Sequence, residues 1–189
     1  MAIFLLIIGL VIYFIFNVIP ITKFHYLFAY LGLALALTSG IGMMANENAH
    51  FGMEAKTTNK QVTIKPTASV GQLNLLVYKQ VGNKGPKVYI YNGKKKHTQV
   101  NTKTINKVKT GYTTATLVTQ ETRYHFKNKF YKLLFGFLGK ENQLKQRVNT
   151  FEVPNTWKVL STSQVTKLKK QMIAMQKKQM LMQAQMQNK

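Results

Sequence analysis

The sequence predicts an α+β membrane protein with an N-terminal transmembrane helical hairpin, a small antiparallel β domain of about six strands and a C-terminal amphipathic helix. Three observations support this fold class. Two apolar runs fill residues 1–45, alternating apolar and polar segments follow them, and no glycine or proline occurs after residue 160. The expected divisions are the hairpin at 1–45, a juxtamembrane linker at 46–62, the basic β domain at 63–160 and a Met/Gln/Lys-rich helix at 161–189.

The hairpin is predicted from two runs without Lys, Arg, Asp or Glu, Ile3–Ile19 and Phe24–Met44. A helix rises about 1.5 Å per residue, so the shorter run is just long enough for a hydrocarbon core of about 30 Å. Pro20 cannot continue a helix and is expected to turn the chain at the interface. A signal peptide is disfavoured, because Met1–Leu6 carries no basic residue and no small-residue cleavage site follows.

The second run contains small residues at a regular spacing. Gly32, Ala36 and Gly40 recur every four residues, a pattern that lets the backbones of membrane helices approach closely. We interpret these three residues as a helix-packing face. Its partner is either the first helix of the hairpin or another membrane protein.

The orientation of the hairpin depends on a few charges. Lys23, in the turn, is the only basic residue before residue 46, so the positive-inside bias places the turn in the cytoplasm and both termini outside. Lys56 and Lys60 favour the opposite orientation, but Glu47 and Glu54 precede them, and long downstream domains translocate largely regardless of charge. The expected location is therefore the cell membrane, with two passes and an extracytoplasmic soluble domain.

The soluble part is a polycation. Lys and Arg total 27 against five acidic residues, and residues 46–189 hold 26 of the basic residues and all five acidic ones, a formal charge of +21. Such a charge predicts anionic partners: wall polymer, acidic lipid headgroups or nucleic acid. No nucleic-acid-binding motif occurs, which disfavours nucleic acid. Cysteine is absent, which excludes disulfides and thiolate metal sites.

The β domain begins with a predicted hairpin. Leu73–Val81 and Lys87–Asn92 are rich in β-branched and aromatic residues, and GNKGP between them supplies turn residues. Asn92 and Gly93 favour a further tight turn, followed by a strand at His97–Val100. Lys94, Lys95 and Lys96 at this turn are interpreted as a solvated loop tip that discourages edge pairing, or as a binding site for an anionic surface.

Three further segments complete the predicted sheet. Tyr112–Phe126 is typical of a long strand, and the segments RVNTFEV and WKVL flank Pro154. The apolar segment Phe130–Leu138 has two interpretations. It is either a core strand or short helix of the β domain, or an interfacial anchor between Lys129 and Lys140.

The C-terminal segment is predicted to be a helix that starts with a capping box at Ser161 and Gln164. Its apolar stripe follows heptad spacing, with one glutamine: Val165, Leu168, Met172, Met175, Gln179, Met182 and Met186. Such a stripe packs on the β domain, on a second copy or on the membrane surface. In the last case four lysines would contact anionic headgroups: Lys169, Lys170, Lys177 and Lys178.

The sequence contains no recognisable catalytic motif. The four histidines have no second His at i+3 or i+4, and the sequence contains no Cys or Asp that could complete a metal set: His25, His50, His97 and His125. No serine lies in a GxSxG context, and no glycine-rich phosphate loop occurs. We therefore expect no enzyme activity, no catalytic residue, no metal and no cofactor.

Segment order carries a resemblance to a known family. After the N-terminal hairpin come HFGM at His50–Met53, LVYKQVGNKG at Leu76–Gly85, VYIY at Val88–Tyr91, FYKLLFG at Phe130–Gly136 and NTFEV at Asn149–Val153. Together these resemble an uncharacterised family of small two-helix membrane proteins from lactic acid bacteria, a domain of unknown function. The resemblance implies a Gram-positive envelope and assigns no site residues. It also implies more basic residues in the hairpin turn than Lys23 alone.

These observations predict a non-enzymatic, membrane-anchored envelope protein whose basic β domain binds anionic wall polymer, lipid headgroups or a membrane partner. One alternative is an accessory subunit of a membrane transporter that docks through the small-residue face. A second alternative is a cytoplasmic membrane tether for nucleic acid, which requires the opposite topology.

Overall fold

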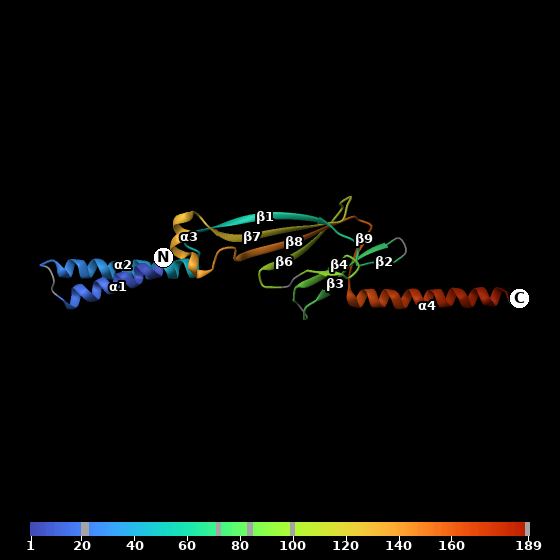
Figure 1. The fold of residues 1–189 in the computed structure, drawn as a ribbon. Helices are drawn as coiled ribbons and strands as arrows, with labels where there is room; N and C mark the ends of the chain where they lie inside the picture. The colour runs from blue at the N-terminus through green and yellow to red at the C-terminus, as the bar shows by residue number, and fades with distance from the viewer. Residues whose placement is uncertain (20–22, 71–72, 83–84, 99–100, 188–189) are drawn as a thin grey trace. The chain divides into compact units, whose positions relative to one another are not determined.

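The computed structural model describes residues 1–189 except 20–22, 71–72, 83–84, 99–100 and 188–189 (Figure 1). Three features expected from the sequence lie outside the described residues: the turn at Pro20, the middle of the GNKGP turn and the end of the strand at Val100. The same holds for the side chain of Met186. The chain divides into two compact units. Unit 1 comprises Met1–Thr57 and Thr122–Lys145, and unit 2 comprises Thr58–Glu121 and Gln146–Lys189.

Unit 1 contains the apolar helices. They are α1 (Ala2–Val18), α2 (His25–Ala49), α3 (Lys129–Phe135) and the 3₁₀ turn η1 (Gly136–Leu138). By length and composition α2 is apolar enough to cross a membrane, and α1, with 17 residues, is a shorter apolar helix. Asn128 caps α3 by accepting a hydrogen bond of 3.1 Å from the Tyr131 backbone N–H, which satisfies one free donor of the first turn.

Nine strands are described, in two sheets. One sheet has the order β1-β7-β8-β6, with β1 at Met53–Thr63, β6 at Thr104–Thr110, β7 at Thr116–Phe126 and β8 at Leu144–Val153. The other has the order β2-β3-β4-β5, with β9 paired to β3. Its strands are β2 at Ala68–Val70, β3 at Leu73–Gln80, β4 at Lys87–Tyr91, β5 at Lys96–His97 and β9 at Trp157–Ser161.

The α+β class is confirmed, but the prediction of an antiparallel domain with about six strands was wrong. Strands β3 and β9 pair in parallel, as do β6 and β8. Parallel pairs need long connections, and the periodicity of a single strand does not reveal a partner far away in sequence. Residues 46–62, expected to be a linker, form the last turn of α2 and most of β1.

One local prediction is confirmed: strands β3 and β4 form an antiparallel hairpin, with Val77 opposite Ile90. The next turn is longer than the tight turn expected at Asn92 and Gly93. Tyr91 pairs with Lys96, so residues 92–95 connect β4 to β5, and Asn92, Gly93 and Lys94 have the left-handed φ values of 53°, 63° and 70°. Strand β5 then occupies Lys96–His97, one residue before the expected start at His97.

The capping box is also confirmed, at the start of α4 (Thr162–Gln187). The Gln164 backbone N–H donates to the Ser161 hydroxyl oxygen at 3.2 Å, and the Ser161 N–H donates to the Gln164 Oε1 at 2.8 Å. These reciprocal bonds satisfy two groups at the helix N-terminus, which explains why α4 begins directly after β9.

The core of unit 2 lies between strands of both sheets. It contains Leu76, Tyr89, Phe151 and Trp157, together with other buried apolar residues. Burial raises the pKa of the Tyr89 hydroxyl above 10.0, and the nearby Tyr78 raises it further. Most of the strand residues that pack this core are β-branched or aromatic, the residue types that pack well on the surface of a sheet.

Candidate membrane-binding region and basic surface

Helices α1 and α2 contact each other through small residues. A Cβ atom added to Gly9 would lie 2.7 Å from the Ala36 backbone nitrogen, and one added to Gly32 would lie 2.7 Å from the Tyr13 nitrogen. The backbones therefore touch at this crossing, where only glycine fits. Gly40, the third residue of the expected packing face, is at an ordinary distance of 3.6 Å from the Leu6 side chain.

The large apolar side chains of these helices point outward. On α1, Phe14 is 68% exposed, and eight more large residues are exposed around the helix: Ile3, Phe4, Ile7, Ile8, Leu10, Val11, Ile15 and Val18. On α2 the exposed set includes Tyr26, Leu27, Phe28, Tyr30, Leu31, Leu37 and Ile41. A water-soluble helix pair places such residues inside and small ones anywhere. The opposite arrangement is the one expected for helices surrounded by lipid.

Helix α3 has one face in a core and one exposed face. Phe135 is only 3% exposed and packs with Ala2, Met53 and Phe126. Phe130 is 62% exposed, and Leu133 and Phe137 are exposed as well. The segment is therefore a short helix with one face in a core, but this core includes Ala2 and is separate from the cluster of Leu76 and Phe151 in unit 2. Its other face is an exposed apolar surface, and the interfacial anchor stays a prediction.

The N-terminus of α1 is attached to α3. The Met1 amino group donates hydrogen bonds to the carbonyl oxygens of Leu133 and Leu134, at 3.0 and 3.3 Å. Met1 and Phe4 also line one shallow groove with Leu133 and Phe137. The exposed apolar surface of α1 thus continues onto α3. We call this continuous surface, formed by the outward side chains of α1, α2 and α3, the apolar belt.

Lysines surround the α3 part of the apolar belt. Lys129 and Lys132 line the same groove, Lys132 pairs with Glu141 at 2.9 Å, and Lys140 pairs with Glu47. Aromatic and leucine side chains bordered by lysines are the usual composition of a segment at the headgroup level of a bilayer. Lys23 is exposed in the turn between α1 and α2, at the end of the helix pair opposite Met1.

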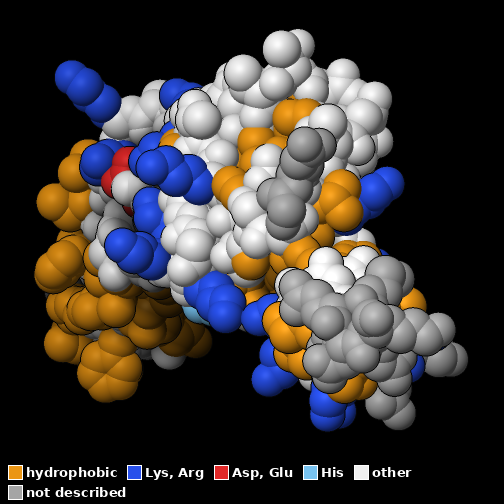
Figure 2. All heavy atoms as spheres, turned by 90° about the vertical axis from the view of Figure 1, so that its right-hand side faces the viewer, with side chains coloured by type: hydrophobic (Ala, Val, Ile, Leu, Met, Phe, Trp, Pro, Cys, Tyr) orange, Lys and Arg blue, Asp and Glu red, His pale blue; other side chains and the backbone are white. Residues whose placement is uncertain are grey.

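The other predicted basic residues lie in unit 2 and are exposed: Lys94, Lys95, Lys96, Lys169, Lys170, Lys177 and Lys178. Lys94 and Lys95 lie in the β4–β5 turn, Lys96 begins β5, and the last four lie on α4. The fold brings only Lys94 and Lys169 to one pocket. Figure 2 shows Lys and Arg side chains spread over the face drawn, with very little acidic surface between them. On this face the positive charge therefore comes from many separate side chains.

Some contributors to this region escaped the sequence prediction. Gly9 is the only glycine of α1, so it shows no repeating pattern, although a lone glycine in an apolar helix is itself a signal of close approach. The Met1 amino group and its α3 partners had no signal, since they are over 130 residues apart. Among the described residues, no group of three His, Cys, Asp or Glu side chains could hold a metal ion.

Comparison with known proteins identifies a family but no activity. The family described as Domain of unknown function (DUF4811) matches residues 22–168, which include α2, both sheets and the first turns of α4. Searches of curated proteins and of solved structures found no match.

Proposed function

The chain belongs to the DUF4811 family, whose description assigns no activity, and from its residues we propose a non-enzymatic, membrane-anchored envelope protein. In this proposal α1 and α2 insert as a two-pass hairpin, and the exposed face of α3 lies at the headgroup level. The basic surface of unit 2 then binds anionic wall polymer, acidic lipid headgroups or a membrane partner.

The arrangement of α1 and α2 carries this proposal. Gly9, Gly32 and Ala36 occupy the contact between the helices while Phe14 and the other large side chains face outward. In water, exposing such a surface costs about 25 cal/mol for each Å² of apolar area, a cost that lipid removes. The apolar belt has no other described element covering it that would remove this cost inside the chain.

The charges support the orientation in which Lys23 faces the cytoplasm. Met1 is bound to α3 at the opposite end of the helix pair, so α3 lies on the extracytoplasmic side in this orientation. The basic surface then meets the outer leaflet or the wall, where anionic polymers and headgroups are available. Attraction of a lysine to an anionic membrane surface contributes about 1 kcal/mol at close approach.

Cysteine labelling in protoplasts of an expressing bacterial host tests the proposal, because the chain has no cysteine of its own. Three single variants of the full chain are used: Phe24→Cys beside Lys23, Leu31→Cys on the outward face of α2, and Lys170→Cys on α4. A membrane-impermeant maleimide should label the residue-170 variant on intact cells and the residue-24 variant only after lysis. The residue-31 variant should react only in detergent.

Each alternative result has a definite meaning. Labelling of the residue-31 variant without detergent would overturn membrane insertion of α2. Labelling of the residue-24 variant on intact cells, with the residue-170 variant protected, would reverse the orientation and favour the nucleic-acid tether. The transporter-subunit alternative gains no support, since α1 already covers Gly32 and Ala36.

A further inference from the structure

The sheet formed by β2, β3, β4 and β5 has apolar residues on both of its faces. Leu76 and Tyr89 enter the core of unit 2. Leu75, Val77 and Ile90 alternate with them in the strands and therefore lie on the other face. On this second face Leu75 is completely buried and Val77 is 5% exposed, so another element must cover it.

The strands leave a junction on this face. Residues of β2 and β4 both pair with β3, β2 along one part of it and β4 along the next. Between the two partners, the Thr67 hydroxyl donates to the Ile90 carbonyl oxygen and accepts a hydrogen bond of 3.0 Å from the Val77 N–H. This hydroxyl thus links β3 and β4 where β2 ends, and the face with Leu75 and Val77 is continuous across the gap.

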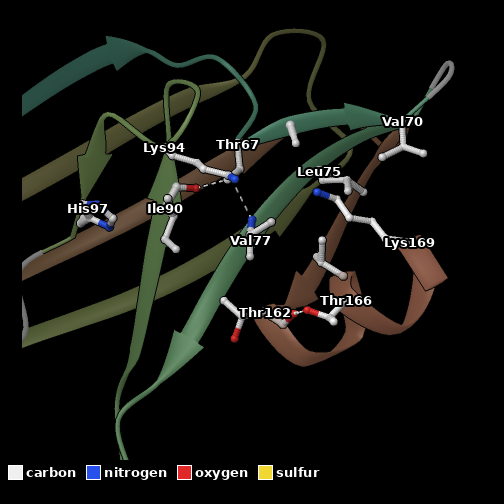
Figure 3. Close-up of a pocket in the computed structure, with 12 residues that line it drawn as sticks. Thr67, Val70, Leu75, Val77, Ile90, Lys94, His97, Thr162, Thr166 and Lys169 are labelled. Carbon is white, nitrogen blue, oxygen red and sulfur yellow. Dashed lines mark hydrogen bonds between the residues drawn. The ribbon is translucent and has the colours of Figure 1, made fainter.

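The first turns of α4 cover this face of the sheet only in part. Val165 and Thr166 of α4 line a pocket of about 300 Å³ together with Leu75 and Val77 of β3. Figure 3 shows Thr166 on the helix side of this pocket and Leu75 and Val77 on the sheet side. The pocket is lined mainly by aliphatic carbon, with Val70 and Ile90 completing the apolar wall. Its volume is at the lower limit of small-molecule sites in proteins, which are typically about 300–1,000 Å³.

The rim of this pocket is cationic. Lys94 reaches over the sheet from the β4–β5 turn and Lys169 reaches toward it from α4, so the two side chains extend from opposite sides (Figure 3). His97 and the Thr162 hydroxyl add hydrogen-bonding groups, and none of the described lining residues is acidic. An occupant with a negative charge at one end meets two ammonium groups there, whereas a cation meets no partner.

We propose that this pocket binds a single-chain anionic amphiphile, an acyl chain that ends in a carboxylate or a phosphate. The acyl chain contacts Leu75, Val77 and Val165, and the anionic end lies between Lys94 and Lys169. The volume suits one chain of moderate length better than a two-chain lipid. The pocket is thus a ligand site of unit 2, separate from the apolar belt of α1, α2 and α3.

Photo-crosslinking in the full chain tests this proposal. The protein is reconstituted in nanodiscs of neutral lipid and exposed to decanoate that carries a diazirine near the end of its chain. Peptide mass spectrometry should place crosslinks on β3 and on the first turns of α4. Decanoate should compete, whereas decanol and acetate should not, because one lacks the charge and the other lacks the chain. A lysophosphatidic acid competitor shows whether the natural anion is a phosphate.

A matched pair of double variants isolates the charges. The Lys94→Gln, Lys169→Gln variant should need about tenfold more probe for the same crosslink yield, the scale of losing a charge-assisted hydrogen bond. The Lys96→Gln, Lys170→Gln variant removes the same charge from neighbouring positions outside the pocket and should leave the yield unchanged. Val165→Trp, which fills the pocket, should abolish crosslinks on β3.

Probe dissolved in the bilayer should also form crosslinks on the membrane helices α1 and α2. The yield of these crosslinks serves as an internal standard for the amount of probe in the bilayer. Equal loss of yield in the two double variants would refute the pocket and leave only attraction by the summed charge. Crosslinks on β3 that decanol displaces as well as decanoate does would refute the anionic end. Absence of crosslinks on α1 and α2, with those on β3 intact, would instead contradict the membrane-anchor proposal and leave this one standing.

Discussion

Replacing Gly32 by valine should separate α1 from α2. A single Cβ at this position would lie 2.7 Å from the Tyr13 nitrogen, 2.8 Å from the Gly9 carbonyl oxygen and 2.8 Å from Ile12 Cγ2. Ordinary contact needs at least 3.4 Å, so the helices must move apart by about 0.7 Å for the Cβ alone, and the two γ-methyl groups require more. Two of the three blocking atoms belong to the backbone and cannot turn away.

The cost of this substitution follows from overpacking. Inserting methyl groups into a closely packed contact typically destabilises it by about 1–3 kcal/mol. Gly40→Ala is the matched control, because its Cβ would meet only the Leu6 side chain at 3.6 Å. The control should therefore be within about 0.5 kcal/mol of the original chain.

Energy transfer in mixed micelles measures the effect. Dyes are attached to cysteines introduced at the exposed positions Ile3 and Met44, and the helix pair is unfolded by increasing amounts of dodecyl sulfate. Gly32→Val should lower the midpoint of the loss of transfer, while Gly40→Ala should not. Equal midpoints for Gly32→Val and the original chain would show that the small residues do not set the distance between these helices.

Three further predictions concern unit 2. Thr67→Val leaves the buried Val77 N–H and the Ile90 carbonyl without their hydroxyl partner, so it should lower the free energy of unfolding by about 1–3 kcal/mol in thermal melts. The control Thr166→Val, at an exposed position, should change the free energy of unfolding little in the same melts. Because the pKa of Tyr89 is raised in the fold, the folded state holds this proton more tightly, so stability present below pH 10.0 should decline as the pH rises above it. The decline should be smaller for Tyr89→Phe in the same melts, and equal slopes would contradict the assignment. In sedimentation assays, binding of the full chain to anionic wall polymer should weaken steeply with salt, because the Debye length shortens from about 10 Å at 0.1 M to about 3 Å at 1 M. Binding that does not change with salt would indicate a specific site instead.

Local sequence signals predicted the local structure. Ser161 and Gln164 are three residues apart, so they meet through the geometry of one helical turn whatever the rest of the chain does. Asn92 and Gly93 likewise adopt the left-handed φ that their residue types favour, although the turn that contains them is longer than predicted. The two apolar helices α1 and α2 also follow from the composition of one continuous stretch each.

The strands that sequence patterns missed are mostly edge strands. Strands β1 and β6 lie at the two edges of their sheet, and β1 is exposed along most of its length. Lysines such as Lys60 and Lys107 replace the alternating apolar residues that identify a half-buried strand. Lysine on an edge strand discourages pairing with other chains. It also interrupts the alternation of apolar and polar residues by which such a strand is recognised in the sequence.

The pocket residues could not have been grouped from the sequence either. Lys94 and Lys169 were each predicted as part of an anionic surface, but they are 75 positions apart in the sequence. Their proximity depends on the parallel pairing of β9 with β3, which places the start of α4 beside the sheet. A parallel pair connected over such a length is a property of the topology and leaves no local pattern.

The stripe on α4 is longer than the surface available to cover it. The helix has 26 residues, about 39 Å at 1.5 Å per residue, whereas five strands spaced about 4.8 Å apart are at most about 24 Å wide. Val165, Leu168 and Met172 are accordingly part-buried, and Met175 and Met182 are exposed. The sheet therefore leaves the second half of the stripe uncovered, and this half is available to a different partner from the first.

The charges of α4 indicate whether a second copy of the chain or the membrane surface is the better partner for this half of the stripe. A second copy of α4 would align lysines with lysines, because the helix contains no acidic residue that could form complementary pairs across a coiled coil. Methionine-rich seams also specify partner helices loosely. An anionic bilayer needs no such complementarity: it accepts the methionines in its interfacial region and attracts Lys177 and Lys178 at its surface. The composition of the exposed half thus favours lipid over self-association, in agreement with the membrane anchor proposed for α1 and α2.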